Sequence, residues 1–208
     1  MNLSTTTILI ALNVAASMYA WKNQNIYQKW MMNPYQVHTK REYYRFLTSG
    51  FIHVDTMHLL FNMLMLYFFG DYAEGILFMV AGNAGTLVYV LFYVVGIIIS
   101  ELPTYFKHRN HPQYNSLGAS GAVSAVLFLF ILFYPLEKLY LFGMVPIPGF
   151  LLGIFYILYS IQMGKRKMDN INHDAHLYGA LYGIIFGIVS YPEVIYQFVQ
   201  QISEFNIF

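Results

Sequence analysis

The 208-residue sequence has no cysteine and few charged residues. The lack of cysteine excludes disulfide bonds, thiolate metal sites and cysteine nucleophiles. Only 10% of the residues are Lys, Arg, Asp or Glu, whereas soluble domains carry about 25%. The net charge of +1 offers no basic surface for nucleic acid. We therefore expect neither an ordinary soluble domain nor a partner of DNA or RNA.

Apolar side chains are abundant instead. Hydrophobic residues make up 58% of the chain and aromatic residues 19%, and the mean hydropathy is +0.49. The few charged residues are gathered in short connectors, and Tyr and Phe are the residue types that suit lipid-facing helices with interfacial belts. These features predict an integral, multi-pass membrane protein.

Six apolar segments use nearly the whole chain, at about 5–21, 58–72, 75–100, 118–134, 149–163 and 172–191. No basic residue precedes the first segment, so we interpret it as an uncleaved span and not as a signal peptide. The connector 22–55 mixes basic and aromatic residues, which suits an interfacial loop. We expect an all-α bundle of six transmembrane helices, with a long interfacial first loop and a single domain over 1–208. The second helix is expected to close at a tight acidic turn near Asp71 and Glu74.

A small hydroxyl residue stands at the entrance of the fourth segment, in Gly118-Ala119-Ser120-Gly121. In the first turn of a helix the backbone N–H groups lack intrahelical partners and the helix dipole is positive, so Ser120 would lie where an oxyanion is stabilised. The alternative is that these small residues only permit close helix packing.

The second segment begins with His58 and Asn62, which share one helix face because they are four residues apart. Polar groups at membrane depth are costly without partners, so they indicate a functional site. The alternative is that they hydrogen-bond to neighbouring helices.

The sixth segment carries a glycine face headed by a histidine. His176, Gly179, Gly183 and Gly187 fall within an arc of about 80° at 3.6 residues per turn. Such a face lets another helix approach closely, and the small residues of the fourth segment are its natural partner. This packing would bring Ser120 and His176 together, and neutral imidazole is the usual base for a serine hydroxyl.

These motifs, in this order, resemble the rhomboid family of intramembrane serine proteases. The resemblance covers all six segments and rests on the motifs His58-x-x-x-Asn62, Gly118-Ala119-Ser120-Gly121 and Ala175-His176-x-x-Gly179-x-x-x-Gly183. It implies that Ser120 is the nucleophile and His176 the general base of a dyad that needs no acid partner. It also implies that the oxyanion is held by His58, Asn62 and the N–H groups of Ala119 and Ser120.

The resemblance assigns supporting roles to further residues and shows two departures. Arg45, His53 and Glu74 match positions that hold the first loop and the end of the second helix, and Gly118, Gly121, Gly179 and Gly183 match packing positions. Tyr44 stands where the family often has tryptophan. Ser124 stands where several members carry an aromatic residue that packs on the catalytic histidine, so we expect a less constrained His176 ring.

A Ser-His-Asp triad and a metal site are the competing chemistries. Asp174 lies two residues before His176 and therefore points to another helix face, so we expect it on the surface. His173 and His176 are three residues apart and His53 is near His58, but a serine mechanism needs no metal. We expect neither a metal nor a cofactor.

The predicted activity is hydrolysis of peptide bonds in or near transmembrane segments of other membrane proteins, at the cell membrane and in contact with lipid. One alternative is a catalytically silent scaffold of the same fold, which would need neither Ser120 nor His176. Another is a small transporter, in which polar residues would extend across the bilayer instead of clustering at the starts of three segments.

The membrane orientation is a point of conflict. The resemblance implies cytoplasmic termini, with the site opening to the opposite side. That arrangement leaves Lys138 as the one basic residue inside and puts outside Lys22, Lys29, Lys40, Arg41, Arg45, Lys107, Arg109, Lys165, Arg166 and Lys167. The positive-inside rule favours the reverse orientation.

Overall fold

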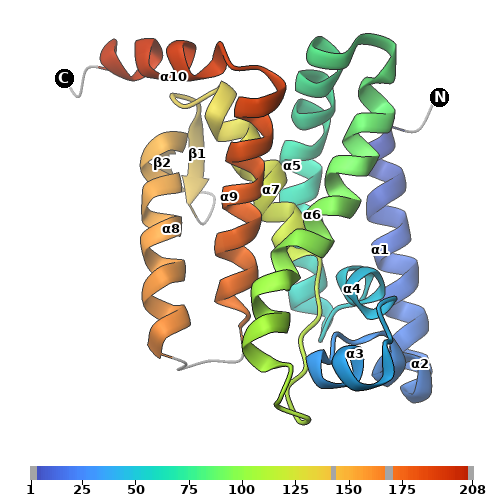
Figure 1. Cartoon of the computed structure of the whole chain (residues 1–208). Coiled ribbons are helices and arrows are strands. Elements are labelled where there is room, and N and C mark those ends of the chain that lie inside the picture. The colour runs from blue at the N-terminus through green and yellow to red at the C-terminus, as the bar shows by residue number, and fades with distance from the viewer. Residues whose placement is uncertain (1–3, 142–143, 167–170, 206–208) are drawn as a thin grey trace.

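The computed structural model describes residues 4–141, 144–166 and 171–205, and Lys167 lies outside these ranges (Figure 1). The six predicted segments are occupied by α1 (Thr5–Lys22), α5 (Thr56–Ala81), α6 (Gly85–His108), α7 (Ser120–Phe133), α8 (Gly149–Arg166) and α9 (His173–Ser190). The other elements are α2 (Gln24–Trp30), α3 (Pro34–Lys40), α4 (Arg45–Thr48), η1 (Ser49–Phe51), η2 (Gly82–Ala84), α10 (Val194–Ser203), β1 (Lys138–Leu141) and β2 (Val145–Pro148). The prediction of a mainly helical chain is thus confirmed, with one short hairpin added.

One helical stretch among the described residues, Thr56–His108, is long and apolar enough to cross a membrane. It contains both α5 and α6. Helices α9 and α10 pass the same criterion only as a pair, and they are bent by 111° at the break between them.

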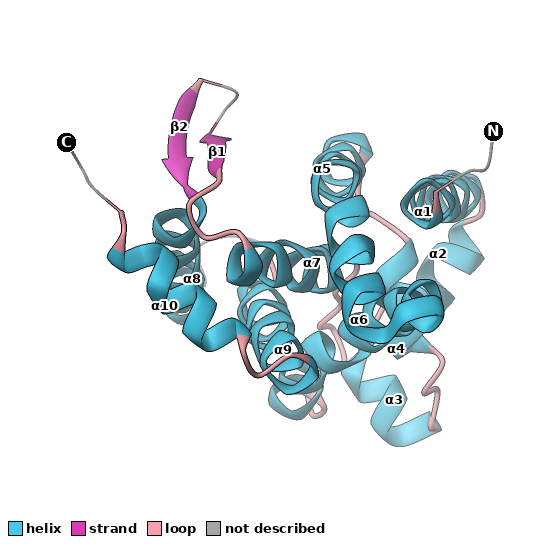
Figure 2. Ribbon diagram, turned by 90° about the horizontal axis from the view of Figure 1, so that it is seen from above, coloured by secondary structure: helices cyan, strands magenta, loops and turns pink. Residues whose placement is uncertain are grey.

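Helix α7 is the centre of the bundle. Every residue from Gly121 to Phe133 is buried, and the view from above shows α5, α6, α8 and α9 around this helix (Figure 2). A helix that is apolar on all sides needs such complete burial. The start of α7, where Ser120 lies, is therefore fixed by four neighbouring helices.

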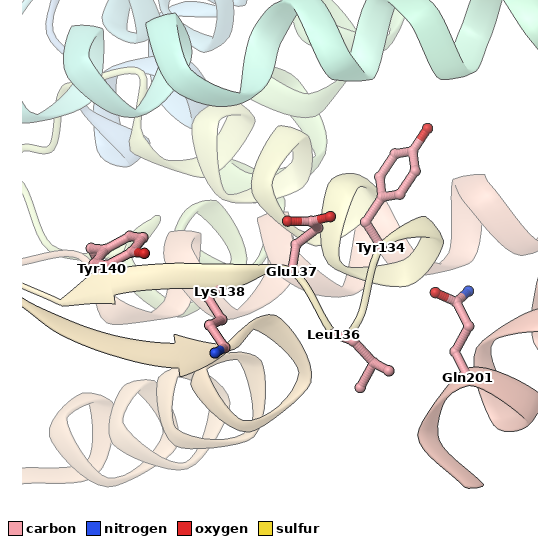
Figure 3. Close-up of a pocket in the computed structure, with 6 residues that line it drawn as sticks. All are labelled: Tyr134, Leu136, Glu137, Lys138, Tyr140 and Gln201. Carbon is pink, nitrogen blue, oxygen red and sulfur yellow. The ribbon is translucent and has the colours of Figure 1, made fainter. Parts of the chain in front are cut away.

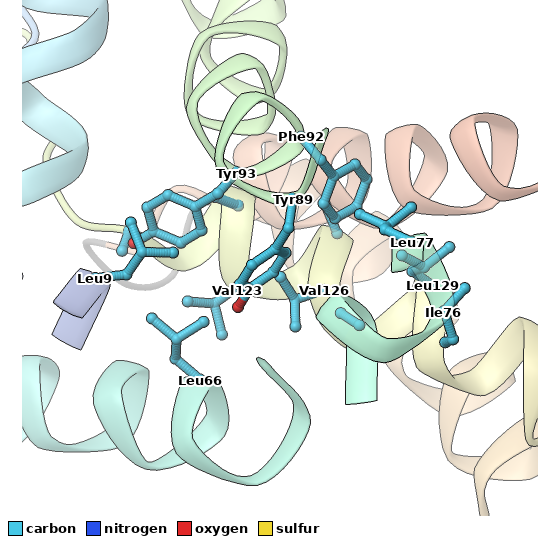
Figure 4. Packing of buried hydrophobic residues seen from close by; sticks show 14 of the residues in the cluster. Leu9, Leu66, Ile76, Leu77, Tyr89, Phe92, Tyr93, Val123, Val126 and Leu129 are labelled. Carbon is cyan, nitrogen blue, oxygen red and sulfur yellow. The ribbon is translucent and has the colours of Figure 1, made fainter. Parts of the chain in front are cut away.

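Helix α1 is attached to the bundle by both apolar and polar contacts. The core combines Leu9 of α1 with the aromatic residues of α6 (Figure 4). Within it, the Tyr89 hydroxyl lies 3.2 Å from Thr6 Oγ1, and Asn13 Nδ2 donates to the Tyr93 hydroxyl at 3.0 Å. Two polar residues of the first apolar segment, Thr6 and Asn13, therefore have partners on α6.

The expected end of the second helix is wrong. Helix α5 does not close at an acidic turn near Asp71 and Glu74 but continues to Ala81. The Glu74 carboxylate accepts hydrogen bonds from Thr5 Oγ1 at 2.6 Å and Thr86 Oγ1 at 2.9 Å. Because α1 and α6 supply these donors, the charge is accommodated within the helix and ties three helices together.

The two ends of the bundle differ. At one end, α10 crosses the bundle and the antiparallel β1–β2 hairpin follows α7, with Lys138 paired with Pro148. A hollow of about 440 Å³ lies there, lined by Tyr134, Leu136, Glu137, Lys138, Tyr140 and Gln201 (Figure 3). None of the predicted site residues lines this hollow.

The first loop folds at the opposite end, where α7 begins. Helices α2, α3 and α4 gather there (Figure 1). Met32 forms an antiparallel bridge with Ser116, and the Gly118 N–H donates to the Ser49 carbonyl at 2.9 Å. The loop therefore holds the extended segment that leads into Ser120.

Candidate active site

A cavity of about 1100 Å³ lies at the end of the bundle where α7 begins. Its lining comes from α5, α6, α7, α8 and α9 and from the first loop. Four of the predicted residues line it: His58, Asn62, Ser120 and His176. Residues from three segments far apart in the sequence are therefore brought to one space.

The glycine face of α9 lies directly on the small-residue face of α7. A β-carbon at Gly179 would be 2.1 Å from the Gly121 carbonyl oxygen, and one at Gly183 would be 2.3 Å from the Ala125 carbonyl oxygen. Real side chains do not reach such distances, so only glycine permits this approach. The contact sets the level of His176 on α9 relative to Ser120 on α7.

Ser120 is the first residue of α7 and is half-buried. One turn later, Ser124 Oγ donates a hydrogen bond to the Ser120 carbonyl at 2.7 Å. The same Ser124 oxygen lies 2.5 Å from the Tyr156 hydroxyl of α8. The first turn of α7 is therefore connected to α8 through a buried serine.

His58 and Asn62 both lie on the cavity side of α5. The His58 ring packs where Gly118 has no side chain, because a β-carbon there would lie 2.5 Å from His58 Cε1. Gly118 also has φ +121°, a conformation that glycine adopts readily. The Asn62 amide donates to the His58 carbonyl of its own helix at 2.9 Å. Within the described part of the chain, neither side chain makes the hydrogen bond to a neighbouring helix that was the alternative.

The Ala119 N–H, one of the predicted oxyanion donors, is engaged in this structure. It donates to His53 Nε2 at 3.3 Å. Because Nε2 accepts, the ring proton is on Nδ1, which donates to Ser17 Oγ at 3.0 Å. Burial, with a smaller contribution from His58, lowers the pKa of His53 to about 3. His53 is thus a neutral acceptor that holds the residue before Ser120.

Arg45 organises the first loop from a buried position. Its guanidinium donates to the Gln28 carbonyl at 2.9 Å, the Met31 carbonyl at 2.7 Å and Gln36 Oε1 at 2.9 Å. The Glu42 carboxylate neutralises it at 2.6 Å. These bonds close the loop over the segment that precedes Ser120.

Sequence reasoning missed a buried polar group beside the cavity. Glu101 of α6 accepts from Ser116 Oγ at 3.1 Å and from Asn172 Nδ2 at 3.3 Å. Asn172 Oδ1 in turn accepts from the Ala175 N–H at 3.1 Å and caps α9. A charged residue within an apolar helix and an Asn before a helical run were the available signals.

Two observations concern the residues of the competing chemistries. Asp174 pairs with Lys107 of α6 at 2.5 Å. Among the described residues, no group of three or more His, Cys, Asp or Glu side chains is arranged to hold a metal ion.

The comparisons with known proteins agree on one family. The family model for the rhomboid domain matches residues 40–193. The chain is 31% identical to RHOMBOID-like protein 12, mitochondrial, of Arabidopsis thaliana, over 74% of this chain and 49% of that protein. It is 30% identical to Rhomboid-like protein 11, chloroplastic, of the same plant, over 73% of this chain and 54% of the relative. The chain thus spans about half the length of these two relatives.

A bacterial relative is matched over more of its own length. Rhomboid protease GlpG of Haemophilus influenzae is 27% identical over 71% of this chain and 70% of that protein. The matched family residues 40–193 include the cavity residues of α5, α7, α8 and α9.

Proposed function

Since this chain belongs to the rhomboid family, whose members are integral membrane proteins, we propose that it is an intramembrane serine endopeptidase. Its proposed substrates are other membrane proteins, cut in or near their transmembrane segments. The main support is that Ser120 and His176 line the same cavity on helices whose backbones are in contact. The protease named among the relatives adds to it.

The chemistry would begin at Ser120. His176 would take the hydroxyl proton as Ser120 Oγ attacks the substrate carbonyl, and would give it to the amine as the C–N bond breaks. Water, activated by His176, would then hydrolyse the ester left on Ser120, releasing the acid product and restoring the serine. A positioned base of this kind contributes about 10²–10⁴-fold to the rate. The reaction uses no cofactor in this proposal.

The oxyanion would be stabilised by His58, Asn62 and the N–H groups of Ser120 and Ala119. Because the Ala119 N–H donates to His53, it would have to exchange that acceptor for the substrate oxygen. His58 and Asn62 line the cavity. The Asn62 amide uses one of its two N–H bonds on the His58 carbonyl and would offer the other to the oxyanion.

We also propose that α1, α5, α6, α7, α8 and α9 all cross the membrane and that residues 1–208 form one domain. The first loop would then lie at the interface, over the site. A substrate helix must unwind locally to expose a carbonyl, because its backbone groups are already hydrogen-bonded in lipid. Small or helix-breaking residues near the cleaved bond are therefore expected.

The proposed location is the cell membrane. Two relatives carry the words mitochondrial and chloroplastic in their names, which describe those proteins. Fractionation of cells that produce this chain would identify its membrane.

The test is cleavage of a single-span substrate by the purified protein in lipid vesicles. Wild-type protein should release two fragments, whereas Ser120→Ala and His176→Ala should release none above background. Labelling by a fluorophosphonate probe, which reacts with activated serines, should be lost in both variants. A folded wild-type protein that neither cleaves nor is labelled would instead be the silent scaffold.

A further inference from the structure

The His176 ring has an aromatic neighbour from α8. The Tyr156 ring lies beside it with 6.1 Å between ring centroids and 26° between the ring planes. Position 124, on α7, carries no aromatic residue in this chain. The ring that borders His176 therefore comes from α8, and not from position 124 of α7, where several members of the family carry an aromatic residue.

Tyr156 is fixed at its base by the packing of α8 on α7. One turn before it, Gly153 lies so close that a β-carbon would be 3.3 Å from Phe128 Cε1. The Phe128 ring in turn contacts the Tyr156 ring with 5.4 Å between centroids. The backbone and one edge of Tyr156 are therefore held by buried residues of α7.

Tyr156 is fixed at its tip by Ser124. Ser124 Oγ has a single proton, and it donates that proton to the Ser120 carbonyl. The Tyr156 hydroxyl, 2.5 Å away, is therefore the donor to Ser124 Oγ. The result is a chain of hydrogen bonds from Tyr156 through Ser124 to the backbone of Ser120.

We propose that Tyr156 is a positioning residue that fixes the orientation of the His176 ring toward Ser120, with Ser124 as its anchor. The proposal rests on the proposed protease function. The planar Tyr156 ring restricts rotation of the His176 imidazole. Because Ser124 also bonds to the Ser120 carbonyl, it fixes the plane of the Tyr156 ring relative to the residue that carries the nucleophile. Tyr156 thus connects base and nucleophile through one rigid unit, without contacting the reacting atoms.

The consequence is kinetic. Misplacement of a catalytic group by about 1 Å costs about 10²-fold in rate, and the substrate does not need Tyr156 for binding in this scheme. Tyr156→Leu should therefore lower kcat by about 10- to 100-fold with little change in KM. Tyr156→Phe keeps the ring and its volume but loses the anchor, and it should show a smaller loss in kcat.

The sharpest test moves the ring from α8 to α7. The pair Ser124→Tyr/Tyr156→Ser keeps one phenol and one small hydroxyl at this contact but exchanges their helices. We expect it to recover most of the kcat that Tyr156→Ser alone loses.

Ser124→Ala and Tyr156→Phe should have non-additive effects, because each breaks the same hydrogen bond. Phe155→Leu changes the exposed aromatic residue that precedes Tyr156 on α8 and lies outside the cavity lining, so it is the matched control and should keep wild-type kcat.

Each outcome is decisive when melting temperatures are measured in parallel. If the wild-type protein cleaves through Ser120 and Tyr156→Leu has the same kcat, the role of Tyr156 is overturned while the proposed protease function stands. The proposal would also be overturned if Tyr156→Ser lowers kcat and the exchanged pair Ser124→Tyr/Tyr156→Ser does not restore it, although both variants melt like wild type. No cleavage by folded wild type would overturn the proposed function and this inference with it.

Discussion

Gly179 of α9 lies on the carbonyl oxygen of Gly121 in α7, with 2.1 Å from that oxygen to the position a β-carbon would take. The two helices are therefore in contact through their backbones at the level of the candidate site. A side chain here would push apart the helices that carry Ser120 and His176.

Gly179→Ala is expected to destabilise the protein by about 1–3 kcal/mol through overpacking and to reduce cleavage strongly. The neighbour is backbone and cannot rotate away. Melting temperature and the rate of substrate cleavage in vesicles measure both effects. Gly75→Ala in α5 is the control, since nothing lies within 4 Å of its β-carbon position. It should keep or raise stability, because Ala has the higher helix propensity. A Gly179→Ala protein that melts and cleaves like wild type would contradict the packing described here.

Gly118→Ala should impair cleavage more than stability. Its β-carbon would meet the His58 ring at 2.5 Å, and φ +121° adds backbone strain of about 1–3 kcal/mol. Gly82→Ala is the matched control, since Gly82 also has a positive φ, +56°, but has open space around it. Both variants should lose stability, measured by thermal melting, and only Gly118→Ala should lose kcat. Equal kcat in the two variants would argue against a role for the His58 position.

Arg45→Ala should destabilise the first loop by about 1–3 kcal/mol, as is typical when a buried donor is removed and its acceptors lose their partner. The variant would leave the Gln28 and Met31 carbonyls and the Glu42 carboxylate without this partner. Arg45→Lys should recover only part of the loss, because an ammonium cannot reproduce the fork of the guanidinium. Limited proteolysis of the loop and thermal melting report the effect, with the exposed Lys40→Ala as control. If Arg45→Lys has the same melting temperature as wild type, the positive charge alone matters at this position.

Acid should destabilise the protein through His53. Its pKa in the folded chain is lowered to about 3, whereas an unfolded histidine has a pKa of about 6.5. Between these values the unfolded state binds more protons, so stability rises with pH across this window and falls on acidification. Melting temperature measured from pH 4 to pH 7 should show this slope.

His53→Gln should flatten that slope, because glutamine can still accept from the Ala119 N–H but does not titrate. The exposed Thr39→Gln changes no titratable group, so it is the control and should leave the slope as in wild type. A slope that is unchanged in His53→Gln would assign the acid sensitivity to another group.

Much of the helical arrangement follows from the sequence because it depends on local periodicity. The six apolar segments, the glycine spacing from Gly179 to Gly187 and the entrance at Gly118 are regular features that any helix would display in the same way. The end of α5 was not predictable on that basis. Asp71 and Glu74 interrupt the apolar run, but Glu is a good helix former, and in the folded chain its carboxylate accepts from the hydroxyl groups of Thr5 and Thr86.

The sequence by itself determined which residue types stand at the helix entrances and which helix faces permit backbone contact. Tertiary structure alone decided that His53 accepts the Ala119 N–H and that Tyr156, instead of a residue at position 124, borders His176. The physical reason is that periodicity fixes the direction of a side chain within its own helix. The rotation and depth at which two helices pack decide which side chains from distant segments meet.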